Sequence, residues 1–343
     1  MLRYYNFAWL ALVTCFLLQD ISLSQDVGRY QFQSRHMGTQ ISIILYAENE
    51  ILAKQASDAA FERIEELNQI MSDYVDESEL NRLSQLSGSG EWMEINDSFF
   101  EVLKESKTIS ENTGGLFDVT IGPMTHNWRY IRMQPEPHLP AEDEVESLKN
   151  RVGYQHIELD GKTGKARLMR YDMQLDFGGI AKGCAAKEAV NVLNQHGIHS
   201  ALVDAGGDIT AGNPPPNRTS WDVAIPKGNV DGKMKYVTLQ FSGETLTTSG
   251  DMYHYVEIDG VRYSHILNPK TGIGATGQIQ ATVISSNSMW ADAYASALTL
   301  MEPEKGIRLI ESLNQTEAII FMKADGEIRE WHSSGIPALL KPE

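Results

Sequence analysis

The ten residues from Leu175 to Cys184, L-D-F-G-G-I-A-K-G-C, constrain the fold of this chain more than any other stretch. They place a carboxylate, three glycines and a lysine just before A-A-K-E-A-V-N-V-L, whose apolar spacing predicts a helix. A strand, a turn and a helix start are therefore expected to meet here. Glycines at a helix entry let backbone N–H groups approach an anion, and the helix dipole favours phosphate there. An ordinary tight turn explains the adjacent glycines equally well, so both interpretations stay open at this point.

Composition limits the kind of partner. The chain has 343 residues, of which 42% are hydrophobic, so it can bury a sizeable core. Its formal net charge of -17 argues against nucleic acid, because binding to a phosphate backbone uses clustered Lys and Arg. A polyanionic ligand must instead be held locally, by backbone amides or by a metal ion.

The N-terminus has the order of a secretory signal: Arg3, an apolar run from Phe7 to Leu18, and then Ser22-Leu23-Ser24. The apolar run, about twelve residues long, is too short to span a bilayer comfortably. Residues 1–24 are therefore predicted to be a signal peptide and residues 25–343 the mature domain. The mature domain is expected to be exported, to the periplasm or another extracytoplasmic compartment.

The two cysteines lead to different expectations. Cys15 could carry a lipid, but Thr14 is a poor fit to the small residue usual at that position, so a lipid-anchored form is the lesser alternative. A lipid anchor is the only membrane association that we expect. Cys184 is then the single cysteine of the mature chain, which rules out an internal disulfide. Because Cys184 lies beside two alanines without a catalytic motif, we expect buried filler, not a nucleophile.

Hydrophobic periodicity predicts a mixed α+β fold, because helices and strands follow one another without steady βαβ alternation. A loop with Trp128, covering 127–141, is expected to run over the surface. Asp97 or Ser98 is expected to cap the third helix. Helices are predicted at 50–71, 77–83, 99–113, 142–150, after the glycine-rich stretch, 288–300 and 304–313. Strands are predicted at 40–46, 92–95, 155–159, 165–168, 201–204, 221–225, 235–241, 253–258, 261–265, 280–284 and 317–322.

Eight short motifs carry a resemblance to a known family. They are Met37-Gly38-Thr39, Met71-Ser72-Asp73-Tyr74 with Ser78-Glu79-Leu80, Phe117-Asp118-Val119-Thr120, Asp176 to Gly183, Gly206-Gly207-Asp208, Thr248-Ser249-Gly250, Ser264 to Pro269 with Thr271-Gly272, and Ala291-Asp292-Ala293. In this order they resemble the ApbE family, the FAD:protein FMN transferases, over about residues 30–321. The resemblance implies a mixed sheet and helix architecture with a central cleft for FAD and a metal ion.

The resemblance also implies a reaction. Such enzymes cut the pyrophosphate of FAD and transfer FMN to a Thr or Ser hydroxyl of a target flavoprotein, with release of AMP. They require a divalent cation, usually Mg²⁺, which suits a phosphoryl transfer that depends on positioning and charge neutralisation. Two alternatives stay open: a FAD pyrophosphatase, in which water replaces the protein hydroxyl, and a protein that binds FAD without chemistry.

The family's metal ligands fall on Gly179, through its carbonyl, and on Asp292 and Ser296. A spacing of four residues places Asp292 and Ser296 on one helix face, as a shared ion requires. The family most often has Thr where this chain has Ser296, a change that keeps the hydroxyl. Without the resemblance, Asp292 reads as a carboxylate near a helix start, favoured by the helix dipole.

The family's FAD contacts map onto both apolar and charged side chains. Apolar and aromatic walls with a few polar groups suit a flat ring system. The alternative to FAD binding is plain core packing for Met37, Phe117 and Leu267. For Lys182 the alternative is a solvated surface charge. The predicted FAD-binding residues are Met37, Tyr74, Leu116, Phe117, Asp118, Asp176, Lys182 and Leu267.

His265 is the candidate for proton handling near the acceptor hydroxyl or the phosphate, with Asp118 or Asp176 as a further catalytic carboxylate. An imidazole has a near-neutral pKa that suits this work. A hydrogen-bonded structural histidine is the alternative. Thr248 and Ser249 are expected to line the pocket for the acceptor or phosphate.

Overall fold

The structure is a computed structural model that describes residues 27–230, 233–251, 254–324 and 326–342. The predicted signal peptide, residues 1–24, lies outside the described residues, and so does Cys15. In the described ranges, no helix is long and apolar enough to cross a membrane.

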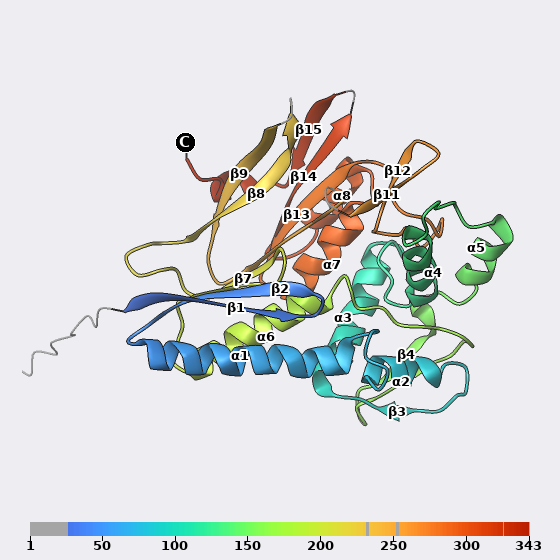
Figure 1. Ribbon diagram of the computed structural model, residues 1–343, viewed down its shortest axis with the longest axis horizontal. Coiled ribbons are helices and arrows are strands. Elements are labelled where there is room, and N and C mark those ends of the chain that lie inside the picture. The colour runs from blue at the N-terminus through green and yellow to red at the C-terminus, as the bar shows by residue number, and fades with distance from the viewer. Residues whose placement is uncertain (1–26, 231–232, 252–253, 325, 343) are drawn as a thin grey trace, which may run out of the picture.

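An eight-stranded sheet runs through the described part of the chain, and each of its strands is antiparallel to its neighbours (Figure 1). Alternate residues of its second strand, Ile41, Ile43 and Leu45, are fully buried, as expected for a sheet that packs one face on a core. The strands, in spatial order, are β1 (Gly28–His36), β2 (Thr39–Ala47), β6 (Ala201–Asp204), β7 (Asp208–Ala211), β10 (Thr245–Gly250), β13 (Ile279–Ser285), β14 (Thr316–Ala324) and β15 (Glu327–His332).

Helices cover one face of this sheet and enclose the largest core. Figure 1 shows α1 and α6 below β1 and β2; α1 contacts both of these strands, and α6 contacts α1, β6 and β7. The apolar stripe of the first helix, including Ala53, Ile64 and Leu67, is fully buried, which confirms the amphipathic helix that the spacing predicts. The helices around this core are α1 (Glu50–Met71), α2 (Glu79–Gln85), α3 (Asp97–Asn112), α6 (Ala181–Gln195), α7 (Ser288–Leu298) and α8 (Pro303–Glu311).

A long hairpin covers part of the other face. It consists of β8 (Trp221–Val230) and β9 (Lys233–Phe241), beside the short helix α9 (Ile336–Leu339). Its buried Trp221 and Phe241 form a second core with residues of the sheet. The sheet is therefore buried on both faces where this hairpin lies.

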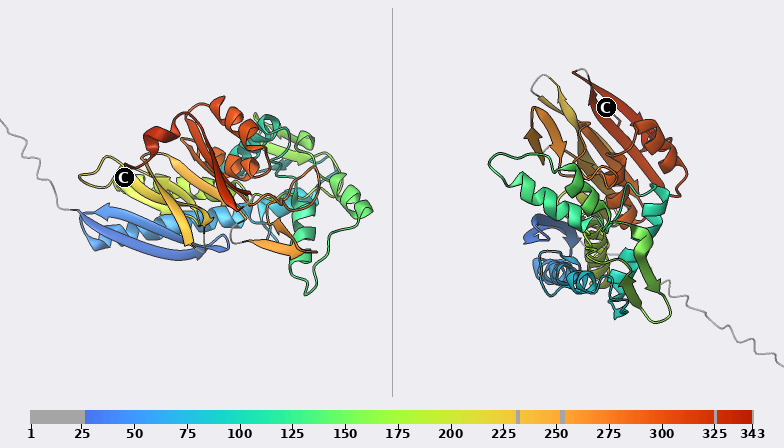
Figure 2. Two further views of the ribbon diagram at one scale, coloured as in Figure 1. Left: turned by 90° about the horizontal axis from the view of Figure 1, so that it is seen from above. Right: turned by 90° about the vertical axis from the view of Figure 1, so that its right-hand side faces the viewer.

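A third group of elements lies on the side of the molecule away from the β8–β9 hairpin (Figures 1 and 2). It has its own small core, which includes the buried Trp128 and Tyr263. The elements are α4 (Gly122–Arg132), α5 (Glu142–Lys149), and the hairpin of β11 (Tyr255–Ile258) and β12 (Val261–Ser264). A small sheet of β3 (Met93–Glu94), β5 (Lys165–Leu168) and β4 (Ile157–Asp160) follows α2, with the 3₁₀ turn η1 (Tyr154–His156) before β4.

The α+β class is confirmed, but the surface loop predicted at 127–141 is wrong in its first part. Residues 127–132 do not belong to a surface loop, because they form the second half of α4, and Trp128 is only 2% exposed. Pro123 begins this helix, where a missing N–H does no harm, and Met124, Trp128 and Ile131 then recur at helical spacing. The proline and methionines nearby were typical of a loop, but the helical period was the stronger signal.

Smaller differences concern edges and caps. Asn96, not Asp97 or Ser98, caps α3, with its side-chain oxygen accepting from the N–H of Ser98 at 2.8 Å. The strand expected at 155–159 starts only at Ile157. The strands β1, β7, β10 and β15 were not predicted. The hairpin turn at Asp259-Gly260 is confirmed, with positive φ at both residues.

Candidate active site

A cavity of about 360 Å³ lies where the turn before α6, the C-terminal end of α7, the inner face of α4 and the segment after β12 meet. Its walls are apolar and aromatic with a few charged groups, as in small-molecule sites. Nine predicted site residues line it: Tyr74, Leu116, Phe117, Asp118, Asp176, Gly179, His265, Leu267 and Ser296. Segments far apart in the sequence therefore converge on one site.

Asp176 fixes the glycine-rich turn to α4. One carboxylate oxygen accepts from the N–H of Gly178 at 2.8 Å. The other accepts from the Thr125 hydroxyl at 2.7 Å and from the Arg129 guanidinium at 2.9 Å. Because both oxygens are used, Asp176 holds the turn in place instead of presenting a free base to the cavity.

The turn leaves a donor available. α6 begins without a side-chain cap from its own chain segment, and among the hydrogen bonds of the described residues the N–H of Gly179 has no partner. Gly179 lines the cavity, and a Cβ added to it would lie 3.5 Å from the Ser296 hydroxyl. A helix start with a free N–H just before it is the arrangement that accepts an anion.

Asp292 of α7 serves as the cap for α6. Its Oδ2 accepts from the N–H of Gly183 at 3.0 Å, and its side chain is only 1% exposed. The two helices come this close because Gly183 has no side chain: a Cβ there would lie 2.4 Å from the carbonyl oxygen of Ser288. The start of α6, which follows the glycine-rich turn, and Asp292 are thus joined by direct contact between their helices.

Two buried carboxylates share one lysine next to this contact. Lys182 forms an ion pair with Asp208, which is 2% exposed, and its Nζ lies 3.9 Å from Asp292 Oδ1. Burial, with the like charge of Asp208, raises the pKa of Asp292. Burial opposes the charge of Lys182, but Asp208 and Asp292 outweigh it and raise its pKa. The cluster therefore has more negative than positive charge.

The oxygen atoms around this cluster fit a hard cation. The hydroxyls of Ser296 and Ser249 lie 3.2 Å apart. Thr247, which is opposite Asp208 in the register of β10 and β7, has a buried hydroxyl oxygen without a hydrogen-bond partner. In the described residues no group of three or more His, Cys, Asp and Glu could hold a metal. A cation here would thus rely on one or two carboxylates with hydroxyl and carbonyl oxygens, a set that suits Mg²⁺ better than Zn²⁺.

His265 lies in the wall of the cavity as a neutral base. Its Nδ1 lies 3.1 Å from the carbonyl oxygen of His254, which can only accept, so Nδ1 carries the proton and Nε2 has the lone pair. Burial lowers the pKa of His265 to about 4, with help from the nearby charges of Arg132 and Lys182. Trp128 positions this segment, since its indole N–H donates to the carbonyl of Ser264 at 3.1 Å.

Asp118 lines the cavity but is fully engaged. Its Oδ1 accepts from the N–H and hydroxyl of Thr120, and its Oδ2 from the N–H of Tyr154 at 2.9 Å. Burial raises the pKa of this carboxyl. Asp118 therefore holds the loop that carries Leu116 and Phe117, and its predicted part in proton handling stays a prediction.

Five predicted residues do not line the cavity itself, among them Thr248 and Ser249 of β10. Lys182 and Asp292 lie behind its wall in the buried charge cluster. Met37 lies in the turn between β1 and β2, partly buried against the main core. That turn touches the turn before β7, because a Cβ on Gly206 would meet the Thr39 hydroxyl at 2.6 Å.

Sequence reasoning missed the inner face of α4. Thr125, Arg129 and Arg132 line the cavity at spacings of four and three residues. Arg129 pairs with Asp73 and Asp176, and its guanidinium lies 4.7 Å from the ring centre of Tyr74. The helical spacing of Met124, Trp128 and Ile131 would have revealed this face, because a helix with those residues in its core places Thr125, Arg129 and Arg132 together on a neighbouring face.

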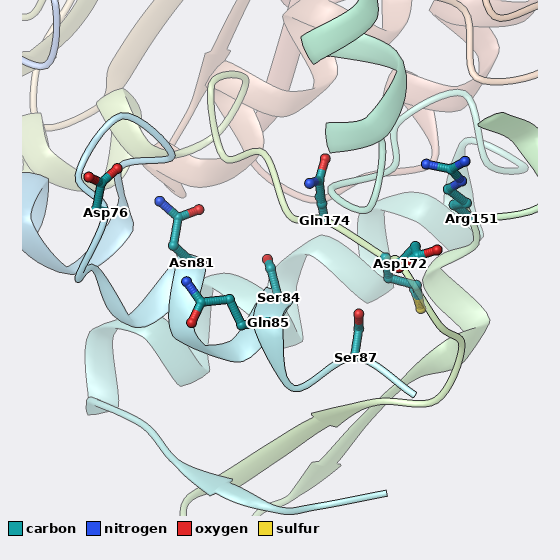
Figure 3. Close-up of a pocket in the computed structure, with 9 residues that line it drawn as sticks. Asp76, Asn81, Ser84, Gln85, Ser87, Arg151, Asp172 and Gln174 are labelled. Atoms are coloured by element: carbon teal, nitrogen blue, oxygen red, sulfur yellow. The ribbon is translucent and has the colours of Figure 1, made fainter. Parts of the chain in front are cut away.

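A second, larger cavity of about 590 Å³ contains none of the predicted site residues. Figure 3 shows its polar lining, with Asn81, Ser84 and Gln85 on α2 and with Asp172 and Gln174 on the facing segment. Its lining contains no histidine and no cluster of buried charge, so we assign the chemistry to the smaller cavity.

Known proteins share both sequence and fold with this chain. It is 29% identical to FAD:protein FMN transferase from Vibrio cholerae over 306 residues, which cover 89% of this chain and 90% of that protein. It is 25% identical to FAD:protein FMN transferase from Escherichia coli over 279 residues, covering 80% and 79%.

Solved structures agree. The chain is similar to flavin transferase ApbE from Vibrio cholerae, with a TM-score of 0.83 and 28% identity over 92% of this chain and 100% of that one. It is also similar to the apo form of flavinyl transferase ApbE from Pseudomonas stutzeri, with a TM-score of 0.78 and 25% identity over 91% and 97%. The profile of the ApbE family matches residues 37–320, which is most of the sequence, and the chain therefore belongs to the ApbE family.

Proposed function

We propose that this protein is a FAD:protein FMN transferase that uses a divalent cation and a Thr or Ser hydroxyl of a target flavoprotein. One observation carries the proposal: Gly179, with its free N–H, and His265, with its free lone pair, line one cavity with apolar walls, and the buried Asp292 cluster lies directly behind the wall at α6. The relatives that bear this activity cover most of the chain.

The cavity can hold a dinucleotide through two kinds of contact. Phe117, Leu267 and Trp128 give flat apolar surface for a ring system. The free N–H of Gly179 and the positive end of α6 favour a phosphate at the opposite wall. The chain thus orients FAD with its diphosphate against the start of α6.

Gly179, Asp292 and Ser296 would hold the cation, with Asp208, Ser249 and Thr247 close by. A bound Mg²⁺ supplies charge neutralisation for the diphosphate and for the departing AMP. The excess negative charge of the Asp208, Asp292 and Lys182 cluster is the feature of this chain that favours it.

His265 handles the proton. In the transfer, the acceptor hydroxyl oxygen forms a bond to the FMN phosphorus, and the bond between that phosphorus and the bridging oxygen breaks. AMP leaves with the electron pair of the broken bond. The hydroxyl proton passes to Nε2 of His265, which is free because Nδ1–H donates to His254.

Mass spectrometry tests the proposal and separates its rivals. The mature protein is incubated with FAD, Mg²⁺ and a candidate acceptor flavoprotein. Transfer predicts a Thr- or Ser-linked FMN on the acceptor and an equal amount of AMP. Free FMN with AMP and an unmodified acceptor would show a pyrophosphatase, and unchanged FAD in the presence of bound flavin would show a binding protein. His265→Gln is the matched variant that should bind FAD but not transfer.

We also propose that the protein acts outside the cytoplasm, on the strength of the signal-like order of residues 1–24. Expression of the full chain followed by cell fractionation checks this. A mature protein that starts near Gln25 and is found outside the cytoplasm supports export, and an uncut cytoplasmic protein contradicts it. A lipid on Cys15 would appear as an added mass on an N-terminal peptide.

A further inference from the structure

One charged side chain in the cavity wall has no counter-charge. Arg132, in the last turn of α4, lines the cavity and is half-buried. In the described part of the chain it forms no ion pair, and no hydrogen bond of its guanidinium is found there. Burial lowers the pKa of Arg132, and no carboxylate offsets this effect. A guanidinium stays protonated in proteins, so a positive charge faces the cavity.

The other cations near the site differ from Arg132 in this respect. Arg129, one turn earlier on α4, pairs with both Asp73 and Asp176. Lys182 is held between Asp208 and Asp292. Because these two charges are already neutralised, Arg132 is the cation of this wall that can accept an anion without giving up an existing partner.

The neighbours of Arg132 are groups assigned to the reaction. Its charge acts on His265, whose pKa it helps to lower, and on Tyr74. Arg132, His265 and Gly179 line the same cavity, so an anion between them would meet a guanidinium from α4 and a backbone N–H from the start of α6.

We propose that Arg132 is a specificity-determining residue that binds the diphosphate of FAD from the side of the cavity opposite α6. This rests on the proposed function and adds a residue to it. A guanidinium presents two parallel N–H donors that match two phosphate oxygens, which a lysine cannot do. Arg132 therefore helps to select a diphosphate-bearing flavin over riboflavin.

A structural role for Arg132 makes a different prediction. A cation in the last turn of a helix is favoured by the helix dipole, and this would affect stability but not the choice between flavins. An acidic side chain of the acceptor is another anion that could reach Arg132. That contact would change the apparent affinity for the acceptor and leave FAD binding alone.

The test compares the binding of two flavins without acceptor. Dissociation constants for FAD and riboflavin are measured in Mg²⁺ by flavin fluorescence for the wild-type mature chain, Arg132→Gln and Arg132→Lys. Arg308→Gln, the same change at an exposed arginine of α8, is the control. We expect Arg132→Gln to bind FAD roughly 10- to 100-fold more weakly, the range for a lost hydrogen bond to a charged group, with riboflavin binding unchanged.

Arg132→Lys should recover part of the FAD affinity, since it keeps the charge but not the paired donors. Inorganic pyrophosphate should compete with FAD in the wild-type chain and more weakly in Arg132→Gln. Equal weakening for FAD and riboflavin, or unchanged FAD binding with a raised KM for the acceptor, overturns the inference. If the wild-type chain itself does not bind FAD, the proposed function fails, which is a different result. If Arg132→Gln does not fold, the FAD to riboflavin ratio of Arg132→Lys decides.

Discussion

At the scale of single residues, His265 sets a pH dependence. Because burial lowers its pKa to about 4, the imidazole is neutral and basic at any pH above that value. We expect the rate of FMN transfer to stay level between pH 8 and about 5 and to fall as the pH drops through about 4. A pH profile of kcat measures this. A fall centred near 6.5 would show that the environment does not lower the pKa and would contradict this account of the site.

The same group affects stability in a defined direction. The pKa of His265 in the folded protein is below its ordinary value of 6.5, so the unfolded chain takes up the proton first as the pH falls. The contribution of His265 to the free energy of unfolding is therefore complete above pH 6.5 and is lost as the pH falls from about 6.5 to 4. Between pH 7 and pH 5, we expect the free energy of unfolding of the wild type to fall more than that of His265→Gln. A constant difference between the two proteins would argue against a buried neutral imidazole.

Tyr74 carries a prediction about binding. Its side chain is 75% exposed and its ring stacks on the Arg129 guanidinium, so it forms the outer edge of the cavity. Tyr74→Ala should weaken FAD retention more than it slows transfer at saturating FAD, because an exposed ring adds contact area and not charge at the phosphorus. Flavin titration and single-turnover rates separate the two effects. Tyr171→Ala, a similarly exposed tyrosine outside the cavity, is the control.

The sequence predicts the site residues that belong to recognisable motifs and misses those that do not. Gly179, His265 and Ser296 stand in short motifs with their reacting groups, and the structure brings them into one cavity. Arg129 and Arg132 stand in no motif, and only the fold of α4 turns them inward. The partner of Lys182 was equally hidden, because a contact with Asp208 depends on how β7 lies under α6.

At the scale of elements, the contact of α6 with α7 lies beside the proposed cation site. An added Cβ at Gly183 would lie 2.4 Å from the Ser288 carbonyl and 3.0 Å from Asp292 Cβ. Gly183→Ala should therefore push the helices apart, lower the free energy of unfolding by about 1–3 kcal/mol and weaken the response to Mg²⁺. Gly161→Ala is the control, since its added Cβ would meet only Phe100 at 3.9 Å. Equal behaviour of the two variants in urea unfolding and in Mg²⁺ titration would contradict this role of Gly183.

α4 supports the site from the other side. Trp128 is buried, stacks edge-on against Tyr263 and holds the Ser264 carbonyl. Trp128→Phe keeps an aromatic ring but loses the indole donor, so it should displace the segment before His265 and slow transfer more than it destabilises the fold. Trp128→Ala should in addition lower the free energy of unfolding by about 3–5 kcal/mol. Unfolding curves and transfer rates of both variants distinguish these effects.

Elements with a strong period were predictable, and edge elements were not. The apolar stripe of α1 and the turn at Asp259-Gly260 can each be recognised from neighbouring residues alone. β1 alternates only between partly buried and exposed residues, and β15 similarly has no buried side chain, so neither has the apolar alternation that marks a half-buried strand. β10 was hidden for another reason: its Thr and Ser residues read as a polar loop, although Thr247 is buried opposite Asp208.

At the scale of the whole molecule, the architecture explains why the charges of the Asp208, Asp292 and Lys182 cluster are costly to bury. α6 and α7 pack on the same face of the sheet, and β7 and β10 place Asp208 and Thr247 beneath them. Both carboxylates of the cluster are therefore buried, whereas the side chain of Lys182 stays 28% exposed. Two carboxylates with one lysine in such a place repel each other. The fold therefore keeps a local excess of negative charge, which a bound cation or a proton on Asp292 would remove.

This leads to a prediction on the stability of the whole chain. Mg²⁺ should raise the Tm of the wild-type protein in proportion to the logarithm of its concentration, because the ion binds the folded state. Asp292→Asn keeps an acceptor for the N–H of Gly183 but removes one charge. We expect this variant to be at least as stable as the wild type in EDTA and to lose the rise in Tm with Mg²⁺. Asp58→Asn, on the exposed face of α1, is the matched control and should respond to Mg²⁺ as the wild type does. A full Mg²⁺ response in Asp292→Asn would remove Asp292 from the cation site, and with it the link between this buried cluster and the transfer of FMN.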